Sequence, residues 1–267
     1  MDTVLWILLF AISVLVIGYC VRHSGDVTWL PTPRNLIEAM LDMALVTSAD
    51  YVIDLGSGDG RIVIAAAKRG AMALGIECRQ TWVEFARAAA AKEGVSERAT
   101  FEKADIFGSD FSKATVLTLF LLSHINIQLR SKILDMKPGT RVVSNTFDLG
   151  DWQPDKITQI KRDLDWVTVF TSQDERCNPT WRTAYLWIVP AKVNGTWNLE
   201  GGQISFTQKF QNITGILTIG KEDTELTGKL DGDKISFNAG GTEYAGTVNG
   251  NTISGTCTGG CSWKCTR

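Results

Sequence analysis

One short stretch, residues 52–63 with the sequence VIDLGSGDGRIV, constrains the fold of this chain more than any other. An apolar run ends at an acidic residue, three glycines follow at alternate positions, and an apolar helical pattern begins directly afterwards. This order predicts a strand, a tight loop and a helix, because glycine allows backbone conformations and close approaches that other residues do not. The stretch therefore predicts a loop that holds a small molecule at the end of a strand.

The spacing and charge of this loop distinguish two kinds of ligand. Gly56 and Gly58 satisfy the first two positions of the dinucleotide pattern Gly-x-Gly-x-x-Gly, but Gly60 comes one residue too early for the third. No Gly-Lys-Ser/Thr follows, as a nucleoside triphosphate loop requires. Asp54 and Asp59 would both repel a diphosphate. A cationic, phosphate-free ligand such as S-adenosylmethionine therefore fits this loop better than NAD.

Two more acidic residues end the next two strand-like segments. Glu77 closes MALGIE, where a carboxylate can accept hydrogen bonds from both ribose hydroxyls of an adenosyl group, and Asp105 ends ATFEKAD. Taken singly, each is more often a surface or capping carboxylate. Together with Asp54 they would line the crevice at the carboxyl ends of consecutive strands, where open α/β sheets bind ligands. The three carboxylates and the glycine loop therefore predict a methyl-donor site.

Residues 23–192 alternate helical and strand-like segments, which predicts an α/β domain with a mostly parallel sheet. The helix expected for TPRNLIEAMLDMA has Thr32 as its N-cap and Pro33 in its first turn. Two late apolar runs, WVTVFTS and TAYLWIVP, are expected to complete the sheet as an antiparallel pair.

Residues 193–267 have a different character, with many glycines and threonines and short alternating strands. GKLDGDKISF and GTVNGNTISG echo each other, and Asp231-Gly232 and Asn249-Gly250 are expected to form two-residue turns of type I′. This part of the chain predicts a small antiparallel β sheet or barrel.

The N-terminal residues include an apolar run, residues 4–21, that is unbroken by charge for 18 positions, close to the ~20 needed to cross a bilayer. We expect residues 1–22 to form an uncleaved transmembrane anchor, with a cleaved signal peptide or a buried core helix as the alternatives. Asp2 precedes the run, and Arg22 and Arg34 follow it, which predicts a single-pass protein whose catalytic domain faces the cytoplasm.

The cysteines near the C-terminus raise the question of metal binding. Cys257, Cys261 and Cys265 form C-x3-C-x3-C, three thiols where a structural zinc has four ligands, and Cys177 would complete the set only by an accident of the fold. In a reducing cytoplasm we expect free thiols, with zinc and a disulfide as alternatives; an outward-facing tail would favour the disulfide. The two histidines have no partner at ligand spacing. No metal is therefore expected in the catalytic site.

The charge of the chain bears on its partners. The 27 basic and 29 acidic residues nearly cancel, and there is no long basic run. Nucleic-acid binding usually needs a basic patch that neutralises phosphates. Nucleic acid is therefore not expected as a partner.

These motifs give the sequence a specific resemblance. Residues 54–105 resemble the class I, seven-stranded S-adenosylmethionine-dependent methyltransferases, which implies a Rossmann-like fold. WLPTPRNLIEAML, DLGSGDGRIVIAAAKRGA and LTLFLLSHINIQLRSKILDMKPGTRVVSNTFDLGDWQP resemble the membrane-anchored protein-lysine methyltransferases that modify the adenine nucleotide translocase and the ATP synthase c-subunit. The match spans residues 29–154 and extends to the hydrophobic anchor. It implies N-methylation of lysine in a membrane-associated protein, with S-adenosylhomocysteine as product.

The resemblance also implies which residues hold the donor. Glu77 would hold the ribose, and Asp105 with Ile106 would hold the adenine. Thr32 would lie near the methionine end of the donor. The methionine part itself would be cradled by the glycine loop, which comprises Asp54, Gly56, Ser57, Gly58 and Gly60. DNA and glutamine methyltransferases carry Asn/Asp-Pro-Pro-Tyr after the fourth strand, where this sequence has LFLLSHIN. That departure argues against amide or base nitrogens as acceptors.

Transfer from a sulfonium is an in-line displacement, so the protein mainly aligns donor and acceptor and excludes water. A lysine must arrive uncharged, which calls for a polar group to take its proton. Asn126, Asp148 and Trp152 are the candidates after strands four and five, although Asp148 can also cap a turn and Trp152 is more often a core residue. A small-molecule or lipid methyltransferase at the membrane surface and a non-catalytic binding module are the alternative functions.

Overall fold

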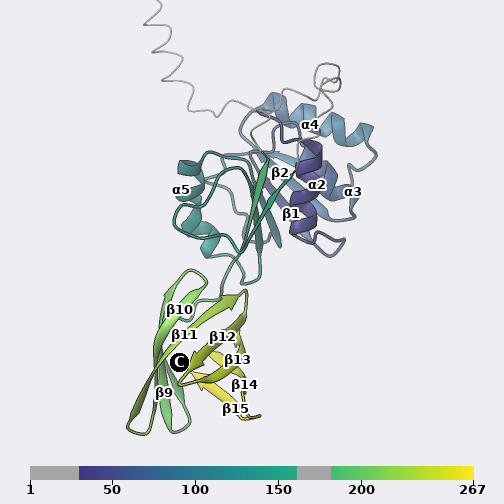
Figure 1. Ribbon diagram of the computed structural model, residues 1–267. Helices are drawn as coiled ribbons and strands as arrows, with labels where there is room; N and C mark the ends of the chain where they lie inside the picture. Colours follow the sequence, from purple (N-terminus) through teal and green to yellow (C-terminus); the bar gives the residue numbers. More distant parts are fainter. Residues whose placement is uncertain (1–29, 161–181) are drawn as a thin grey trace, which may run out of the picture. The chain divides into compact units, whose positions relative to one another are not determined.

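The computed structural model describes residues 30–160 and 182–267 (Figure 1). The predicted anchor, residues 1–22, the predicted strand WVTVFTS, residues 166–172, and Cys177 lie outside them. Residues Pro31–Arg267 form one compact unit. Among the residues described, no helix has the length and apolar character to cross a bilayer.

The first part of this unit is a mixed seven-stranded sheet with the strand order β3-β2-β1-β4-β5-β7-β6. The first five strands run parallel, and β7 is antiparallel to both of its neighbours. The strands are β1 (Tyr51–Leu55), β2 (Met72–Glu77), β3 (Ala99–Lys103), β4 (Val116–Leu119), β5 (Arg141–Asn145), β6 (Lys156–Gln159) and β7 (Thr183–Ile188). The order reverses between β1 and β4, and open α/β sheets bind their ligands at the carboxyl ends of the strands at such a point. The predicted Rossmann-like sheet is confirmed, and TAYLWIVP supplies its antiparallel strand.

Helices cover both faces of this sheet (Figure 1). α2 (Arg34–Met43), α3 (Arg61–Lys68) and α4 (Gln80–Lys92) bury their apolar stripes against one face, and α5 (Ser123–Leu134) covers the other. This two-sided burial explains why the residues of β1 and β4 are buried at successive positions rather than at alternate ones, with Asp54 and Thr118 as the polar exceptions in otherwise apolar strands.

The predicted cap of the first helix is wrong by one residue. α2 begins at Arg34 with Pro33 as its N-cap, and the Pro33 carbonyl accepts a hydrogen bond from the Ile37 amide at 2.9 Å. Pro33 has an extended ψ of 143°, so the helix cannot start before it. The Thr32 hydroxyl instead accepts a hydrogen bond from Asn145 Nδ2 at 3.2 Å, which ties the start of α2 to the end of β5.

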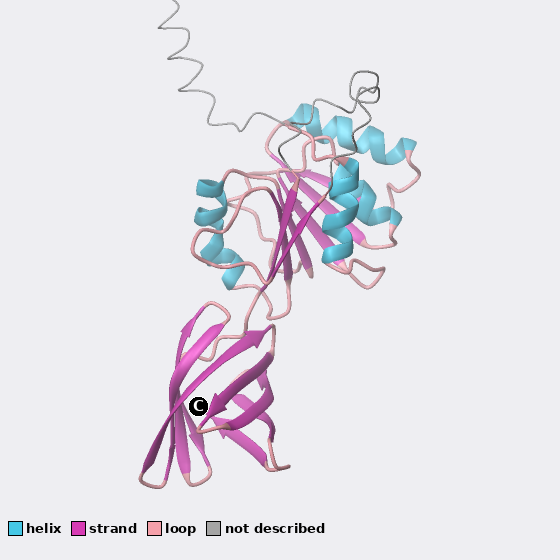
Figure 2. Ribbon diagram, viewed as in Figure 1, coloured by secondary structure: helices cyan, strands magenta, loops and turns pink. Residues whose placement is uncertain are grey.

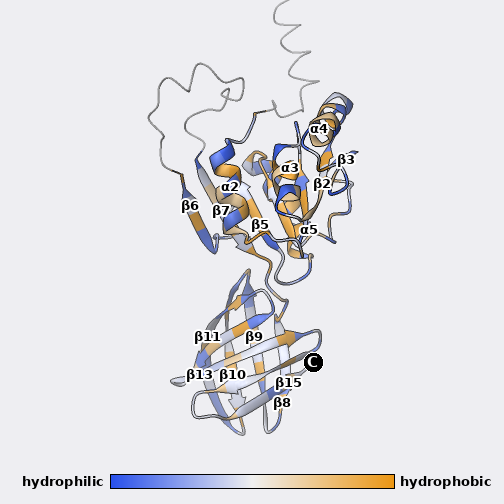
Figure 3. Ribbon diagram, turned by 90° about the vertical axis from the view of Figure 1, so that its right-hand side faces the viewer, coloured by the Kyte–Doolittle hydropathy of each residue, from blue (hydrophilic) through white to orange (hydrophobic). Residues whose placement is uncertain are grey.

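The second part is a closed antiparallel barrel of eight strands, each paired with the next along the chain and β15 paired with β8 (Figure 2). Alternate side chains fill its interior, with Trp197, Phe206 and Phe237 almost fully buried. Hydrophobic and hydrophilic residues both occur along the strands of the barrel (Figure 3). The predicted β domain is confirmed. Its strands are β8 (Gly195–Leu199), β9 (Gly202–Lys209), β10 (Asn212–Ile219), β11 (Glu222–Asp231), β12 (Lys234–Ala239), β13 (Thr242–Asn249), β14 (Thr252–Cys257) and β15 (Ser262–Thr266).

The echoed turns of the barrel are shifted by one residue from the prediction. Asp231 pairs with Lys234, so the two-residue loop is Gly232-Asp233, and the equivalent loop of the β13–β14 hairpin is Gly250-Asn251. Only the first residue of each loop has a positive φ, 58° at Gly232 and 57° at Gly250. This is the pattern of type II′ turns, which need glycine at the first central position, and not of type I′ turns.

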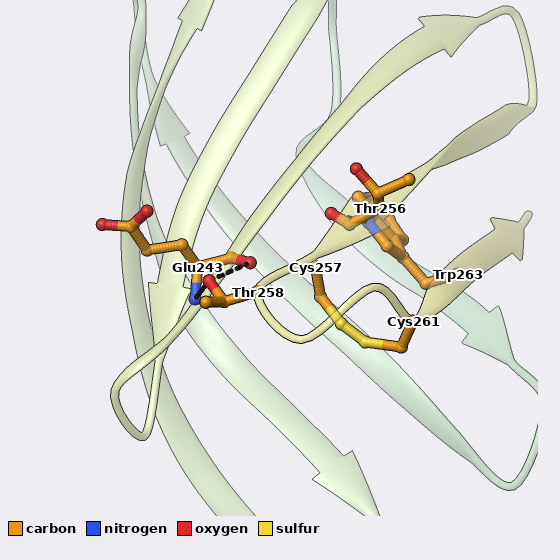
Figure 4. The surroundings of a disulfide bond; sticks show 6 residues. All are labelled: Glu243, Thr256, Cys257, Thr258, Cys261 and Trp263. Carbon is orange, nitrogen blue, oxygen red and sulfur yellow. Dashed lines mark hydrogen bonds between the residues drawn. A yellow bond between two sulfur atoms is a disulfide. The ribbon is translucent and has the colours of Figure 1, made fainter.

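The C-terminal cysteines are not all free thiols, which corrects the favoured expectation. Cys257 and Cys261 form a disulfide with their Cα atoms 5.3 Å apart (Figure 4). The loop between β14 and β15 turns tightly, since the Cys257 amide donates to the Cys261 carbonyl at 2.9 Å, and this brings the two thiols together. Cys265 faces the barrel core opposite Ile253, and burial raises the pKa of its thiol to about 11.

Candidate functional site

The glycine loop after β1 is tied to the end of β2 by its own amides. The Gly56 and Ser57 amides both donate to the Ile76 carbonyl, at 2.8 and 3.1 Å, and the Gly58 amide donates to Glu77 Oε2 at 3.0 Å. These three amides therefore fix the loop against the neighbouring strand.

The glycines of the loop have different roles. All three have positive φ, between 50° and 80°, which few other residues adopt. A Cβ on Gly60 would lie 2.6 Å from the Phe101 ring and 2.8 Å from the Ala86 Cβ, so this glycine lets α3 and α4 pack on the sheet. Gly56 is exposed, and a Cβ there would meet only Leu121 Cδ2, at 3.0 Å. Gly56 is therefore the place where a ligand can approach the backbone.

Glu77 is held in one orientation at the carboxyl end of β2. Its side chain is buried, with Oε2 accepting from the Gly58 amide and Oε1 accepting from the Arg79 amide at 3.0 Å. Each carboxylate oxygen has two lone pairs, so Oε2 keeps one for a ligand, while Oε1 also accepts from the weak donor Cys78 Sγ at 3.4 Å, which a ribose hydroxyl could replace. The geometry suits a carboxylate that accepts hydrogen bonds from a pair of ribose hydroxyls.

Asp54 is buried at the end of β1, between β2 and β4. Its Oδ1 accepts a hydrogen bond from Thr118 Oγ1 at 2.6 Å. Burial, together with the smaller effects of the nearby charges of Asp59 and Glu77, raises the pKa of this carboxyl to about 7, although the hydrogen bond from Thr118 lowers it. A cation bound nearby would stabilise the ionised form of Asp54, which matches a donor that carries an ammonium and a sulfonium.

Asp59 does not repel anions in the way expected from its position in the sequence. Arg61 Nε donates to Asp59 Oδ2 at 2.9 Å, Nη2 donates to the same atom at 2.6 Å, and Nη1 donates to the Thr32 carbonyl at 3.0 Å. The guanidinium compensates the Asp59 charge because the pair is close and largely shielded from solvent. The electrostatic preference against a diphosphate therefore rests on Asp54 and Glu77.

The remaining donor-side predictions lie around this loop. Asp105 follows β3, is exposed, and accepts a hydrogen bond from the Phe107 amide at 3.0 Å. Ile106 is half-buried and packs against the core under α5. Ser57 is buried, and its hydroxyl lies 2.5 Å from where a Cβ on Gly75 would be, so it points back toward β2.

The predicted acceptor-side residues have unequal access to solvent. Asn126 is fully buried on α5, and its Nδ2 donates to the Asp148 carbonyl at 3.2 Å and the Phe147 carbonyl at 3.4 Å. Trp152 is also fully buried, and its Nε1 donates to Gln211 Oε1 of the barrel at 2.9 Å. Of the three, only Asp148 is exposed.

The sequence analysis did not predict an aromatic pair at the carboxyl ends of β4 and β5. Phe120 follows β4 and Phe147 follows β5; both are half-buried, and their rings stack with centroids 6.0 Å apart and planes 25° apart. Parallel neighbouring strands bring their carboxyl ends together, so an aromatic residue within two positions after the end of each strand was the available signal. The pair forms an apolar wall at the carboxyl ends of β4 and β5.

The residues around the crevice fit S-adenosylmethionine. Gly56 leaves room for close approach, Glu77 presents oriented acceptors, and Asp54 is a buried carboxyl that a cation would ionise. A diphosphate finds no such match, since the loop amides of Gly56, Ser57 and Gly58 already donate within the protein.

Comparisons with known proteins agree with this geometry. The family model described as the ANTKMT methyltransferase domain matches residues 54–156. A protein-lysine N-methyltransferase of Saccharolobus islandicus is 41% identical over 142 residues, which cover 52% of this chain and 88% of that protein. The human lysine N-methyltransferase of the ATP synthase c-subunit is 32% identical over 152 residues, covering 55% of this chain and 65% of that protein.

A solved structure extends the comparison to the fold. It is that of an RNA methyltransferase from Salinibacter ruber in complex with S-adenosyl-L-homocysteine. It is 37% identical, has a TM-score of 0.53, and aligns with 61% of this chain and 96% of that chain.

Proposed function

Because the chain belongs to the family of the ANTKMT methyltransferase domain and is an S-adenosylmethionine-dependent methyltransferase, we propose that it N-methylates lysine in a protein substrate. The observation that carries the proposal is the 41% identity to a protein-lysine N-methyltransferase across 88% of that protein. The match covers 65% of the human lysine N-methyltransferase of the ATP synthase c-subunit, which is less than two thirds of that protein. A substrate like the ATP synthase c-subunit is therefore part of the proposal.

When bound, S-adenosylmethionine supplies a methyl group on a sulfonium sulfur that an amine displaces in line. Glu77 would hold the ribose, while Asp105 and Ile106 would flank the adenine. The methionine part would lie over the glycine loop, close to Thr32 and Asp54, in a cradle made by Gly56, Ser57, Gly58 and Gly60. These assignments are supported by the position of the loop at the carboxyl ends of β1 and β2.

On the acceptor side, the lysine nitrogen must lose a proton before it attacks the methyl carbon. We assign this proton to the carboxylate of Asp148, because that side chain is exposed beside the Phe120–Phe147 wall. The wall would cover the methylene groups of lysine and exclude water. Asn126 would act indirectly, by holding the Asp148 carbonyl.

The Salinibacter ruber relative is named an RNA methyltransferase, which makes RNA the second acceptor class to test. The formal net charge of −2 and the apolar residues after β4 speak against it. A membrane lipid or small molecule is the third class.

The experiment offers all three acceptor classes to the full chain together with S-adenosylmethionine labelled in its methyl group. Membrane proteins, soluble proteins, total RNA and a lipid extract are separated after the reaction, and labelled proteins are searched for methyl-lysine by mass spectrometry. Label in lysine supports the proposal. Label confined to RNA or lipid, absent with a Glu77→Ala control, contradicts it.

We also propose that residues 4–21 anchor the enzyme in a membrane with its catalytic part in the cytoplasm. The length of the apolar run and the basic residues after it support this. The Cys257–Cys261 disulfide is more typical of an oxidising compartment. Alkylation of intact cells with a thiol reagent before lysis distinguishes a cytoplasmic from an oxidising location of the barrel. A cytoplasmic location predicts that both cysteines are alkylated. A pair that resists alkylation contradicts the proposed orientation.

A further inference from the structure

The tip of the β9–β10 hairpin differs from a pattern that four other hairpins of the barrel share. Lys209 pairs with Asn212, so the two-residue loop is Phe210-Gln211, and Phe210 has a positive φ of 55°. Glycine occupies this first position in four other two-residue loops of the barrel, Gly220, Gly232, Gly240 and Gly250. The backbone of Phe210 is therefore strained, whereas glycine would adopt the same φ without strain.

The strained residue packs against the methyltransferase part of the same compact unit. The Phe210 ring stacks on Trp152 with centroids 5.7 Å apart and planes 15° apart. The guanidinium carbon of Arg130 lies 5.2 Å from the centre of the Phe210 ring. Glycine at this position would make neither contact.

The second residue of the tip adds polar contacts to the same segment. Gln211 is buried; its Oε1 accepts from Trp152 Nε1 at 2.9 Å and its Nε2 donates to the Gln153 carbonyl at 2.8 Å. Trp152 Nε1 and the Gln153 carbonyl both lose these partners if Gln211 is truncated. Because buried polar groups are costly when unpaired, these bonds fix where the segment lies.

The segment held by this tip leads back to the acceptor side. Trp152 forms a β-bridge with Leu149, whose carbonyl accepts from Arg130 Nη1 at 2.7 Å. One turn earlier on α5, Asn126 donates to the Asp148 carbonyl. Residues 147–152 are therefore held by α5 and, through Trp152, by the hairpin tip.

We propose that Phe210 and Gln211 are positioning residues for methyl transfer. The barrel hairpin keeps residues 147–152 in one arrangement, and this keeps Phe147 and Asp148 aligned with the donor. The location of the acceptor beside Asp148 rests on the proposed function, but the effect of the hairpin on this segment does not.

The test compares Phe210→Gly and Gln211→Ala in the full chain with Ile219→Ala, an exposed residue beside the β10–β11 turn. In the first two variants, hydrogen exchange at residues 147–152 becomes faster in the presence of S-adenosylmethionine, while the affinity for that donor stays within about twofold of wild type. The kcat/KM for the acceptor falls about tenfold or more, since a misplacement of about 1 Å can cost about a hundredfold. Ile219→Ala changes none of these.

A double-mutant cycle between Gln211→Ala and Trp152→Phe adds a readout that simple loss of stability does not move. The two substitutions remove the same hydrogen bond from opposite sides, so their effects on kcat/KM are less than additive. Wild-type exchange at residues 147–152 in both hairpin variants overturns the proposal. So does a parallel loss of donor affinity, which marks a general loss of folding. If wild type methylates no lysine, the exchange comparison still decides whether the hairpin positions the segment.

Discussion

The amide of Gly58 donates a hydrogen bond of 3.0 Å to Oε2 of Glu77, 19 positions further along the chain. This bond joins the turn after β1 to the carboxylate that ends β2, so two motifs that are separate in the sequence form one rigid corner. The consequence is that Glu77 is oriented before any ligand arrives, and donor binding does not have to order it.

The first prediction concerns Glu77 itself. Glu77→Gln keeps one side-chain oxygen but loses the negative charge and one acceptor oxygen. A hydrogen bond to a charged group contributes about 1.5 kcal/mol or more, so the affinity for S-adenosylmethionine should fall by about tenfold or more. Titration calorimetry measures this. Glu93→Gln, an exposed carboxylate paired with Lys68, is the matched control and should bind like wild type. Equal affinity in both variants would remove Glu77 from the donor site.

The second prediction follows from Asp54. The folded-state pKa of this carboxyl is raised to about 7 from its ordinary value of 3.8, so the folded state holds its proton more tightly than the unfolded state. Its contribution to stability is present below pH 3.8 and is lost as the pH rises through about 7. Wild type should therefore lose stability relative to Asp54→Asn across this window in urea unfolding curves.

Donor binding should reverse this trend. A cationic ligand favours the ionised carboxylate, so the affinity of wild type for S-adenosylmethionine should rise with pH up to about 7, the folded-state pKa of Asp54. Asp54→Asn should show a flatter profile over the same range. Parallel profiles for the two proteins would mean that Asp54 does not sense the donor.

The third prediction separates packing from backbone strain at two glycines. Gly60→Ala should destabilise the fold by about 2–4 kcal/mol, because the new Cβ meets Phe101 and Ala86 in addition to the cost of a positive φ. Gly94→Ala has open space around the Cβ and only the strain of its φ of 70°, so about 1–2 kcal/mol is expected. Similar values in denaturant unfolding would show that Gly60 is not needed for helix packing.

The fourth prediction tests the proton acceptor. Asp148→Asn should lower kcat by about a hundredfold, with little change in donor affinity. Asp135→Asn, an exposed carboxylate at the C-terminal end of α5 paired with Lys192, is the control. An unchanged kcat in Asp148→Asn would assign the proton to another group or to water.

Much of the architecture was predictable because it depends on local patterns. The loop VIDLGSGDG, the apolar strands and the amphipathic helices each carry their own signal, and their alternation implies a parallel sheet. The β structure of residues 193–267 was predictable from their glycine-rich alternating pattern. The turn predicted at Asp231-Gly232 lies one residue further along the chain, because type I′ and type II′ turns share Asn, Asp and Gly.

What the sequence could not provide were contacts between distant residues. Arg61 cancels the charge of Asp59, and Thr32 pairs with Asn145, 113 positions away. The stack of Phe210 on Trp152 joins the barrel to the loop after β5, and no local pattern announces it. Cys257 and Cys261 pair because of a turn that only the folded barrel defines.

The most direct measurement is the identity of the methylated atom. Wild-type protein and Glu77→Ala are incubated separately with S-adenosylmethionine carrying a heavy methyl group and with membranes, and all protein side chains are then mapped by mass spectrometry. We expect heavy methyl groups on lysine Nζ with wild type and none with the variant. Heavy methyl found only on RNA, lipid or another side chain would contradict lysine methylation by this enzyme.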